Sequence, residues 1–167
     1  MTYKDIRKNM DSGDTVACKR RSLISILIRI FTAESTNHTA ICYRNDDGGM
    51  YIYEMREGKG LLITPMSQWI HKMKRDEISI TYCKAPENTS AILMRHALDK
   101  LRDKDPDYSY ITLIKVALSQ WFNKPLNGNY VCSTSAQKIH EAGGYKGYKK
   151  LCDPGDIEEH SPFKISL

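Results

Sequence analysis

The chain has 167 residues, which fits one domain over residues 1–167 and is long enough to bury a hydrophobic core. Its content of 41% hydrophobic and 27% charged residues is ordinary for a globular protein, and no repeat, low-complexity tract or long linker is present. The net charge of +5 permits contact with nucleic acid, anionic membrane or cell-wall polymer but selects none of them. Short basic clusters at 19–21 and 72–75 are more typical of a solvated face than of a nucleic-acid site, so we expect no specific nucleic-acid partner.

Strand-like runs dominate the first half of the chain. The predicted strands cover residues 15–19, 38–43, 50–55, 60–64 and 77–83. The second and third are rich in β-branched and aromatic residues, and the segment between them, Arg44–Gly49, carries a strong turn signal. These two strands are therefore predicted to form a hairpin.

Helical patterns follow the strands, apart from one early apolar run. The predicted helices cover residues 22–32, 66–73, 88–102 and 109–122, with a further helix beginning near Cys132. The first is too short for the ~20 residues that span a bilayer, which leaves a buried core helix or an interfacial one and predicts no transmembrane segment. The predicted apolar stripe of the 88–102 helix consists of Ile92, Leu93, His96, Leu98 and Leu101, with Asn88 or Thr89 as its cap.

This order of elements predicts an α+β protein with an antiparallel sheet packed against helices. The segment 153–157, Asp-Pro-Gly-Asp-Ile, is predicted to be a turn near the end of the chain. The N-terminus has no signal-peptide pattern, so we expect a cytoplasmic location, with release by lysis or another route of delivery left open.

The cysteines are dispersed and odd in number. They are Cys18, Cys42, Cys83, Cys132 and Cys152. No Cys-x-x-Cys pair occurs, which indicates neither a zinc site nor a disulfide framework, so we expect no native disulfide and a reducing compartment. The first three lie in strand-like runs and are interpreted as small core residues.

Cys132 differs from the other cysteines because it stands at the start of a predicted helix. It follows the turn-forming run 125–128, and the polar residues 133–135 suit the first turn of a helix. A thiol there faces the unpaired N–H groups and the positive end of the helix, which favour thiolate over thiol. Thiolate is the nucleophilic form, so Cys132 is the candidate nucleophile.

A cysteine nucleophile needs a base, and His38 is the best placed of the five histidines. It opens a predicted strand after a polar run, where it can project from a rigid sheet into a cleft; a structural strand residue is the alternative. His96 is expected in the core or at its edge. His71, His140 and His160 are expected at the surface.

Glu54 is the candidate carboxylate that orients the His38 ring. It is an isolated acid in an otherwise apolar strand, for which an exposed position is the alternative. Pairing His38 directly opposite Glu54 leaves a five-residue loop, 44–48, within the usual range of roughly two to five. A tight Asp47-Gly48 turn is the competitor, and it puts Glu54 on the opposite face from His38.

In this order the motifs resemble the circularly permuted papain-like amidases and peptidases, the YiiX/YaeF-like branch of the NlpC-like superfamily, which is related to the lecithin retinol acyltransferases. The resemblance covers roughly residues 12–157. It rests on Gly13-Asp14 before the first strand, His38, Glu54, the run Tyr130-Val131-Cys132-Ser133, and Pro154-Gly155-Asp156. Family members often carry Glu where this chain has Thr134, a departure expected to affect substrate preference more than chemistry.

The resemblance implies a permuted papain-like fold and a thiol hydrolase. Cys132 would attack the carbonyl of an amide, such as a cell-wall peptide, with His38 as base and Glu54 as its orienting partner. It implies no metal or organic cofactor. The alternatives are an acyltransferase or esterase acting on lipid, and a non-catalytic binding module on the same fold.

Overall fold

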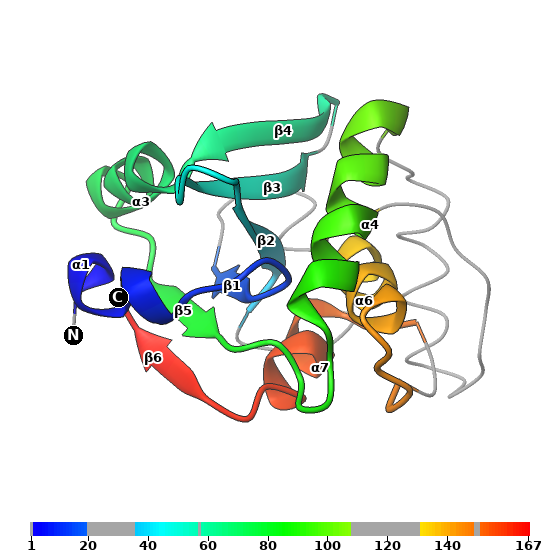
Figure 1. Cartoon of the computed structure of the whole chain (residues 1–167). Coiled ribbons are helices and arrows are strands. Elements are labelled where there is room, and N and C mark those ends of the chain that lie inside the picture. Colours follow the sequence, from blue (N-terminus) through cyan, green and yellow to red (C-terminus); the bar gives the residue numbers. More distant parts are fainter. Residues whose placement is uncertain (1, 20–35, 57, 108–130, 149–150) are drawn as a thin grey trace.

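The computed structural model of the chain describes residues 2–19, 36–56, 58–107, 131–148 and 151–167 (Figure 1). The helices expected over 22–32 and 109–122 lie outside these residues.

One antiparallel sheet of six strands forms the centre of the described chain. Its strands are β1 (Thr15–Cys18), β2 (His38–Arg44), β3 (Met50–Arg56), β4 (Gly60–Pro65), β5 (Ile80–Cys83) and β6 (Lys164–Ser166). Their order across the sheet is β4-β3-β2-β1-β5-β6 (Figure 1). The five predicted strands are confirmed, although β5 begins at Ile80 rather than at Glu77, whose left-handed backbone (φ 54°) does not suit a strand. The three-residue strand β6 was not predicted.

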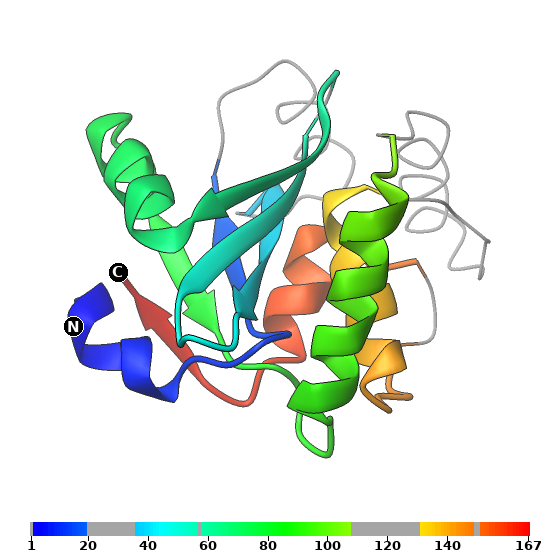
Figure 2. The ribbon, with the colours of Figure 1, turned by 45° about the horizontal axis from the view of Figure 1, so that its top comes forward.

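Helices cover both faces of this sheet, which confirms the α+β class. They are α1 (Tyr3–Ile6), the short 3₁₀ helix η1 (Arg7–Asn9), α3 (Met66–Arg75), α4 (Ala91–Lys104), α6 (Cys132–Ala142) and α7 (Pro154–Glu159). Helices α1 and α3 lie on one side of the sheet, and α4, α6 and α7 lie on the other (Figure 2). Their buried apolar side chains form two separate clusters, one on each face. None of the helices in the described residues is both long and apolar enough to cross a membrane.

The turn predicted at 153–157 is wrong, because this segment begins helix α7. The Asp153 side chain accepts a hydrogen bond from the Asp156 N–H at 2.8 Å and so caps the helix. Pro154 occupies the first helical position, where its missing N–H leaves no hydrogen bond unmade. The Pro-Gly-Asp run is therefore a helix start rather than a turn between other elements.

Helix α4 forms as predicted, but its first residue and its buried face differ in part from the prediction. Asn88 has a left-handed backbone (φ 62°), so the helix begins later, with Ser90 as its cap. Ile92 and Leu93, placed in the predicted stripe, are 70% and 51% exposed. The buried residues of α4 are Met94, Leu98 and Leu101, so the apolar stripe is rotated from the one that the pattern suggested.

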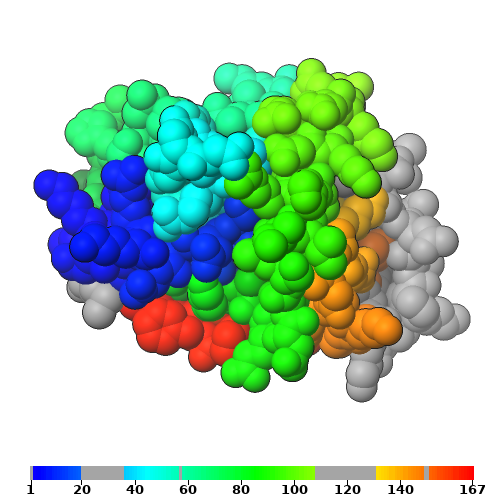
Figure 3. Space-filling model, in the orientation of Figure 1, coloured from blue at the N-terminus to red at the C-terminus, as the bar shows by residue number. Residues whose placement is uncertain are grey.

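The loop between β2 and β3 lies on the surface between the N-terminal segment and α4 (Figure 3). The Arg7 guanidinium donates to the Gly48 carbonyl at 3.4 Å, and Arg95 of α4 forms an ion pair with Asp46 at 2.6 Å. Both contacts are on the surface, so each stabilises the protein little, but together they show which elements flank the hairpin.

Gly13, in the Gly-Asp pair before β1, has a backbone that only glycine adopts readily. Its φ is +97°, and a Cβ at this position would collide with the Met94 side chain. Its N–H donates to the Cys42 carbonyl at 3.0 Å, and its carbonyl accepts from His140 Nε2 at 2.9 Å. The glycine therefore lets the segment before β1 approach both the sheet and α6.

Asp14, the next residue, is a fully buried carboxylate that joins the segment before β1 to the end of β5. Its Oδ1 accepts from the Ala85 N–H at 2.9 Å, and its Oδ2 accepts from the Tyr82 hydroxyl at 2.6 Å. Oδ2 also accepts from the Asp11 N–H at 2.7 Å and forms an ion pair with Lys84 at 3.1 Å. These donors compensate the loss of hydration of the buried charge and fix β1 to β5.

We predict that Asp14→Ala lowers the free energy of unfolding by about 3 kcal/mol or more, because it leaves the buried Ala85 N–H and Tyr82 hydroxyl without their acceptor. Urea unfolding followed by circular dichroism measures the change. Asp103→Ala, at a side chain that is 70% exposed, is the control and should change stability by no more than about 0.5 kcal/mol. Equal losses in the two variants would contradict a structural role for Asp14.

Candidate active site

Cys132 is the first residue of α6, as the sequence predicted. Val131 precedes it in extended conformation, and the Val131 N–H donates to Thr134 Oγ1 at 3.0 Å. The N–H groups of the first helical turn have no acceptor within the helix, so they are directed at whatever lies beside its start. The Cys132 sulfur lies in that position.

Thr134 takes part in the capping of α6. Its side chain is buried, and it accepts from the backbone N–H three residues earlier. In a capping box that contact is made by Glu or Gln at the same helical position. Thr134 therefore makes the contact at the helix start with a shorter side chain than Glu or Gln.

The pKa of the Cys132 thiol is lowered even though the residue is buried. Burial raises this pKa, but a hydrogen bond from His38 and the positive charge of its ring lower it. The backbone N–H groups of Thr39 and Ser133 donate to the sulfur and lower it further. The net direction is below the ordinary value, which favours the thiolate.

The remaining cysteines are buried, and none of them forms a disulfide among the described residues. Burial raises the pKa of Cys83 to about 12 and raises that of Cys42 well above its ordinary value. Cys18 and Cys42 pack in the hydrophobic core between the sheet and α3, as the sequence predicted. Cys132 is therefore set apart from Cys42 and Cys83 by electrostatics and not by burial.

His38 connects Cys132 to Glu54. It is the first residue of β2, and its Nε2 lies 3.1 Å from Glu54 Oε2. All three side chains are nearly buried: Cys132 is 4% exposed, His38 7% and Glu54 3%. The ring thus contacts groups from both sides of the sheet. The Glu54 carboxylate lies on the side that α3 covers, and the Cys132 sulfur belongs to α6, which packs on the other side.

The hairpin register differs from the predicted one by two residues. The prediction placed His38 directly opposite Glu54, whereas the observed pairing of Tyr43 with Tyr51, continued along the strands, sets Glu54 opposite Ala40. A shift of two residues preserves the face on which a side chain lies, so Glu54 and His38 remain on the same side. They are diagonal neighbours, a separation that long side chains can bridge.

The loop that sets this register has five residues, as predicted, but it covers 45–49 instead of 44–48. The Asn45 N–H donates to the Gly49 carbonyl at 3.0 Å, and the Gly48 N–H donates to the Asn45 carbonyl at 3.1 Å. Gly48 has φ +78°, which suits glycine. The tight Asp47-Gly48 turn is not formed, so the inverted face that it would impose does not arise.

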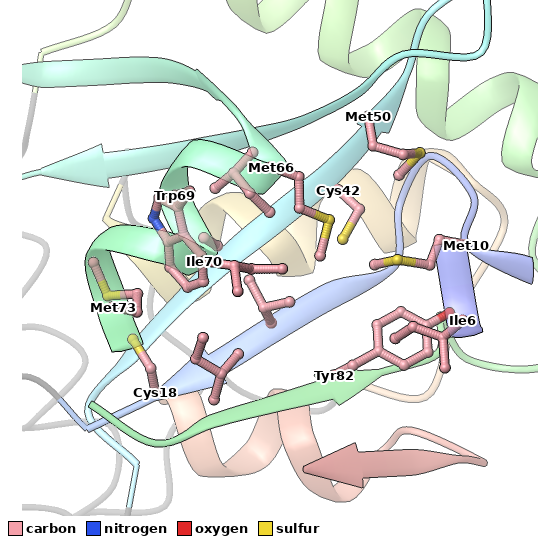
Figure 4. Close-up of a cluster of buried hydrophobic side chains, with 14 residues drawn as sticks. Ile6, Met10, Cys18, Cys42, Met50, Met66, Trp69, Ile70, Met73 and Tyr82 are labelled. Atoms are coloured by element: carbon pink, nitrogen blue, oxygen red, sulfur yellow. The ribbon is translucent and has the colours of Figure 1, made fainter. Parts of the chain in front are cut away.

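Trp69 of α3 is a member of this group that the sequence analysis did not identify. Its indole N–H donates to Glu54 Oε2 at 3.2 Å, the same oxygen that faces His38. A tryptophan among apolar residues in an amphipathic helix is typical of a core position, and Trp69 is indeed buried there (Figure 4). No pattern in the sequence indicated that its nitrogen would face a carboxylate.

Two of the predictions for other histidines are wrong. His96, expected in the core or at its edge, is exposed on α4. His140 was expected at the surface but is 1% exposed. His71 is exposed as predicted, whereas His160 is half-buried and contacts the Asp156 carbonyl at 2.7 Å.

His140 is buried as a neutral ring. Burial lowers its pKa from 6.5 to about 4, although the contact with the Gly13 carbonyl opposes this change. Its Nε2 donates to that carbonyl, and its Nδ1 therefore accepts from the Tyr148 hydroxyl at 2.6 Å. His140 is thus a structural residue that fixes the segment before β1 to α6.

Thr39 has a buried hydroxyl without a hydrogen-bond partner in the part of the chain that the structure describes. Its backbone N–H is one of the donors to the Cys132 sulfur. Within the same described ranges, no three His, Cys, Asp or Glu side chains are grouped as they would be to hold a metal ion.

No known family profile and no curated protein matches the sequence. Among solved structures the chain is similar to YiiX of Escherichia coli O157:H7, a protein described as a metalloprotein, DUF1105. The TM-score is 0.60 at 14% sequence identity, over 94% of this chain and 96% of YiiX. At this identity the similarity shows the fold alone, so the YiiX-like fold expected from the motifs is confirmed and the cysteine chemistry remains a prediction.

The neutral state of His140 predicts a loss of stability in acid. The unfolded chain takes up a proton below about pH 6.5, whereas the folded protein resists protonation until about pH 4. Between these values the His140 contribution falls by about 1.4 kcal/mol per pH unit, or roughly 3 kcal/mol in all. Urea unfolding from pH 7 to pH 4 measures the slope.

The slope of the free energy of unfolding against pH should be smaller in His140→Gln, whatever the stability of that variant at pH 7. His71→Gln, at an exposed position, is the matched control and should retain the slope of the unsubstituted protein. If His140→Gln also retained it, the buried neutral histidine would not be the source of acid sensitivity.

Proposed function

We propose that the protein is a thiol hydrolase that cleaves an amide through a thioacyl-enzyme, with Cys132 as nucleophile, His38 as base and Glu54 as the carboxylate that orients the ring. One observation carries this proposal: a single buried imidazole contacts both a thiol of lowered pKa and a carboxylate. Perturbed groups in such an arrangement are typical of catalytic sites. The resemblance to permuted papain-like enzymes supports the same roles for these residues.

The division of roles follows from the two nitrogens of the ring. Because His38 Nε2 faces Glu54, Nδ1 is the nitrogen left to exchange a proton with Cys132. The thiolate attacks the substrate carbonyl carbon, and a tetrahedral intermediate forms. The His38 imidazolium then gives its proton to the leaving nitrogen as the carbon–nitrogen bond breaks, which releases the amine and leaves a thioester on Cys132.

The start of α6 is suited to stabilise the negative charge that develops on the carbonyl oxygen. Its first N–H groups have no acceptor within the helix, and their dipoles point toward the sulfur. Donors fixed in this way before reaction are effective because they need no reorganisation in the transition state. The Ser133 N–H is one of these groups, and together with the Thr39 N–H it supports the thiolate in the resting site.

The second half of the reaction removes the acyl group. Neutral His38 takes a proton from water as its oxygen attacks the thioester, and the departing Cys132 sulfur regains thiolate form beside the imidazolium. A cell-wall peptide or a similar amide is the substrate class that the resemblance suggests. An acceptor other than water would make the same intermediate an acyl-transfer step, as in the lipid-acting relatives.

We predict that Cys132→Ala abolishes turnover of any amide or ester substrate while the fold remains intact. A panel of peptidoglycan peptides and acyl lipids, with and without an added amine acceptor, identifies the substrate, and mass spectrometry detects the acyl adduct on Cys132. Cys83→Ala is the matched control because burial raises the pKa of that thiol to about 12. It should retain turnover, and full activity in Cys132→Ala would remove the hydrolase proposal.

We also predict that Glu54→Gln lowers kcat by less than His38→Ala does. The amide keeps the size of the side chain and can still contact the ring, but it carries no charge to stabilise the imidazolium. Removal of a general base typically lowers the rate by about 10²–10⁴-fold, and the Glu54 effect should lie below that of His38→Ala. Full activity in Glu54→Gln would refute its orienting role and leave the pair of Cys132 and His38 standing.

A further inference from the structure

We propose that Trp69 is a positioning residue for this site: its indole N–H holds the Glu54 oxygen that the His38 ring contacts, so that α3 completes a chain from Trp69 through Glu54 and His38 to Cys132. The inference rests on the proposed roles of the last three residues. It adds a fourth residue from an element that carries none of them.

The geometry shows two donors converging on one acceptor atom. Glu54 Oε2 lies 3.2 Å from Trp69 Nε1 and 3.1 Å from His38 Nε2. Trp69 is 2% exposed and Glu54 is 3% exposed, so both side chains are shielded from solvent. The indole nitrogen has only one hydrogen to donate, and it is committed to this oxygen.

A packing role alone does not account for this contact. Trp69 lies at the same end of the core between α3 and the sheet as Cys18, whose strand neighbour is His38 (Figure 4). Phenylalanine would fill much of the same apolar space without a donor. The structure instead directs the polar edge of the indole at the carboxylate, and a buried carboxylate retains its charge only if donors replace the water it has lost.

Several other ionisable groups lie on this side of the sheet among the described residues. They include Cys18 opposite His38 on β1, Arg56 two residues beyond Glu54 on β3, and the exposed His71, Lys72, Lys74 and Arg75 of α3. Cys42, Tyr82 and Tyr3 belong to the same core. On the other side, Cys132 of α6 contacts the ring. Trp69 and His38 are the side chains seen to donate to Glu54 in the described part of the protein.

The consequence of losing the indole N–H has a definite sign. Glu54 loses one of the donors that favour its charged form, so it takes up a proton at a higher pH. Neutral Glu54 supports the His38 imidazolium less, and the imidazolium in turn supports the Cys132 thiolate. The pH at which the Cys132 thiolate takes up a proton on acidification, which we call its acid edge, is therefore higher when Trp69 no longer donates.

The test is a titration of the Cys132 thiolate that requires no substrate. The ultraviolet absorbance of the thiolate is measured against pH as the difference between each protein and its own Cys132→Ser counterpart. In Trp69→Phe we expect the acid edge to move up by about half a pH unit or more, which means roughly threefold less thiolate on the acid side. Ile70→Val, at the next buried position of α3, is the matched control and should leave the edge in place.

A double variant distinguishes action through Glu54 from a local disturbance. When Glu54 is already Gln, adding Trp69→Phe should cause no further shift, because residues that act through one another are not additive. If Trp69→Phe fails to fold, benzothienylalanine at position 69 retains the shape of the ring, removes only the N–H, and should move the edge in the same direction.

Each outcome has one reading. An edge unmoved by loss of the N–H, or a shift that persists in full in the Glu54→Gln background, overturns the role of Trp69 and leaves the hydrolase proposal intact. If the Cys132 thiol of the unsubstituted protein titrates at the ordinary pKa of a cysteine, both proposals are overturned, because no supported thiolate would then exist.

Discussion

The pairing of β2 with strands on both of its sides is the constraint on which the candidate site depends. β1 fixes the start of β2 by pairing Cys18 with His38, and β3 fixes the rest of the strand. The His38 ring therefore has a defined position along the strand and lies on a defined face of the sheet. Because Glu54 is held by the same hairpin, its distance from the ring follows from backbone pairing rather than from the freedom of either side chain.

Burial makes this arrangement costly unless every charge finds partners. Removing a carboxylate from water carries a penalty of several kcal/mol, which geometry and hydrogen bonds have to offset. Two buried carboxylates among the described residues show how this need is met. Asp14 accepts from backbone, hydroxyl and ammonium donors at one place, and Glu54 accepts from Trp69 and His38 at another. The first joins strands, whereas the second lies beside a thiol whose pKa is lowered.

The sequence predicted the elements and faces of this site better than its contacts. Alternation in the hairpin placed Glu54 and His38 on one face correctly, since that depends only on whether the register shift is odd or even. The register itself depends on hydrogen bonds within the loop 45–49, which residue types do not specify. The burial of His140 depends on Gly13, a residue far away in the chain, so no local pattern could reveal it.

The site is also divided between the two layers of the fold, which has a consequence for how it forms. Cys132 belongs to α6 on one face of the sheet, and Trp69 belongs to α3 on the other. The sheet alone carries His38 and Glu54, so neither layer holds a complete set of groups. The thiolate is therefore supported only when both helices are packed, and any change that loosens α3 acts on the sulfur through Glu54 and His38 without touching it.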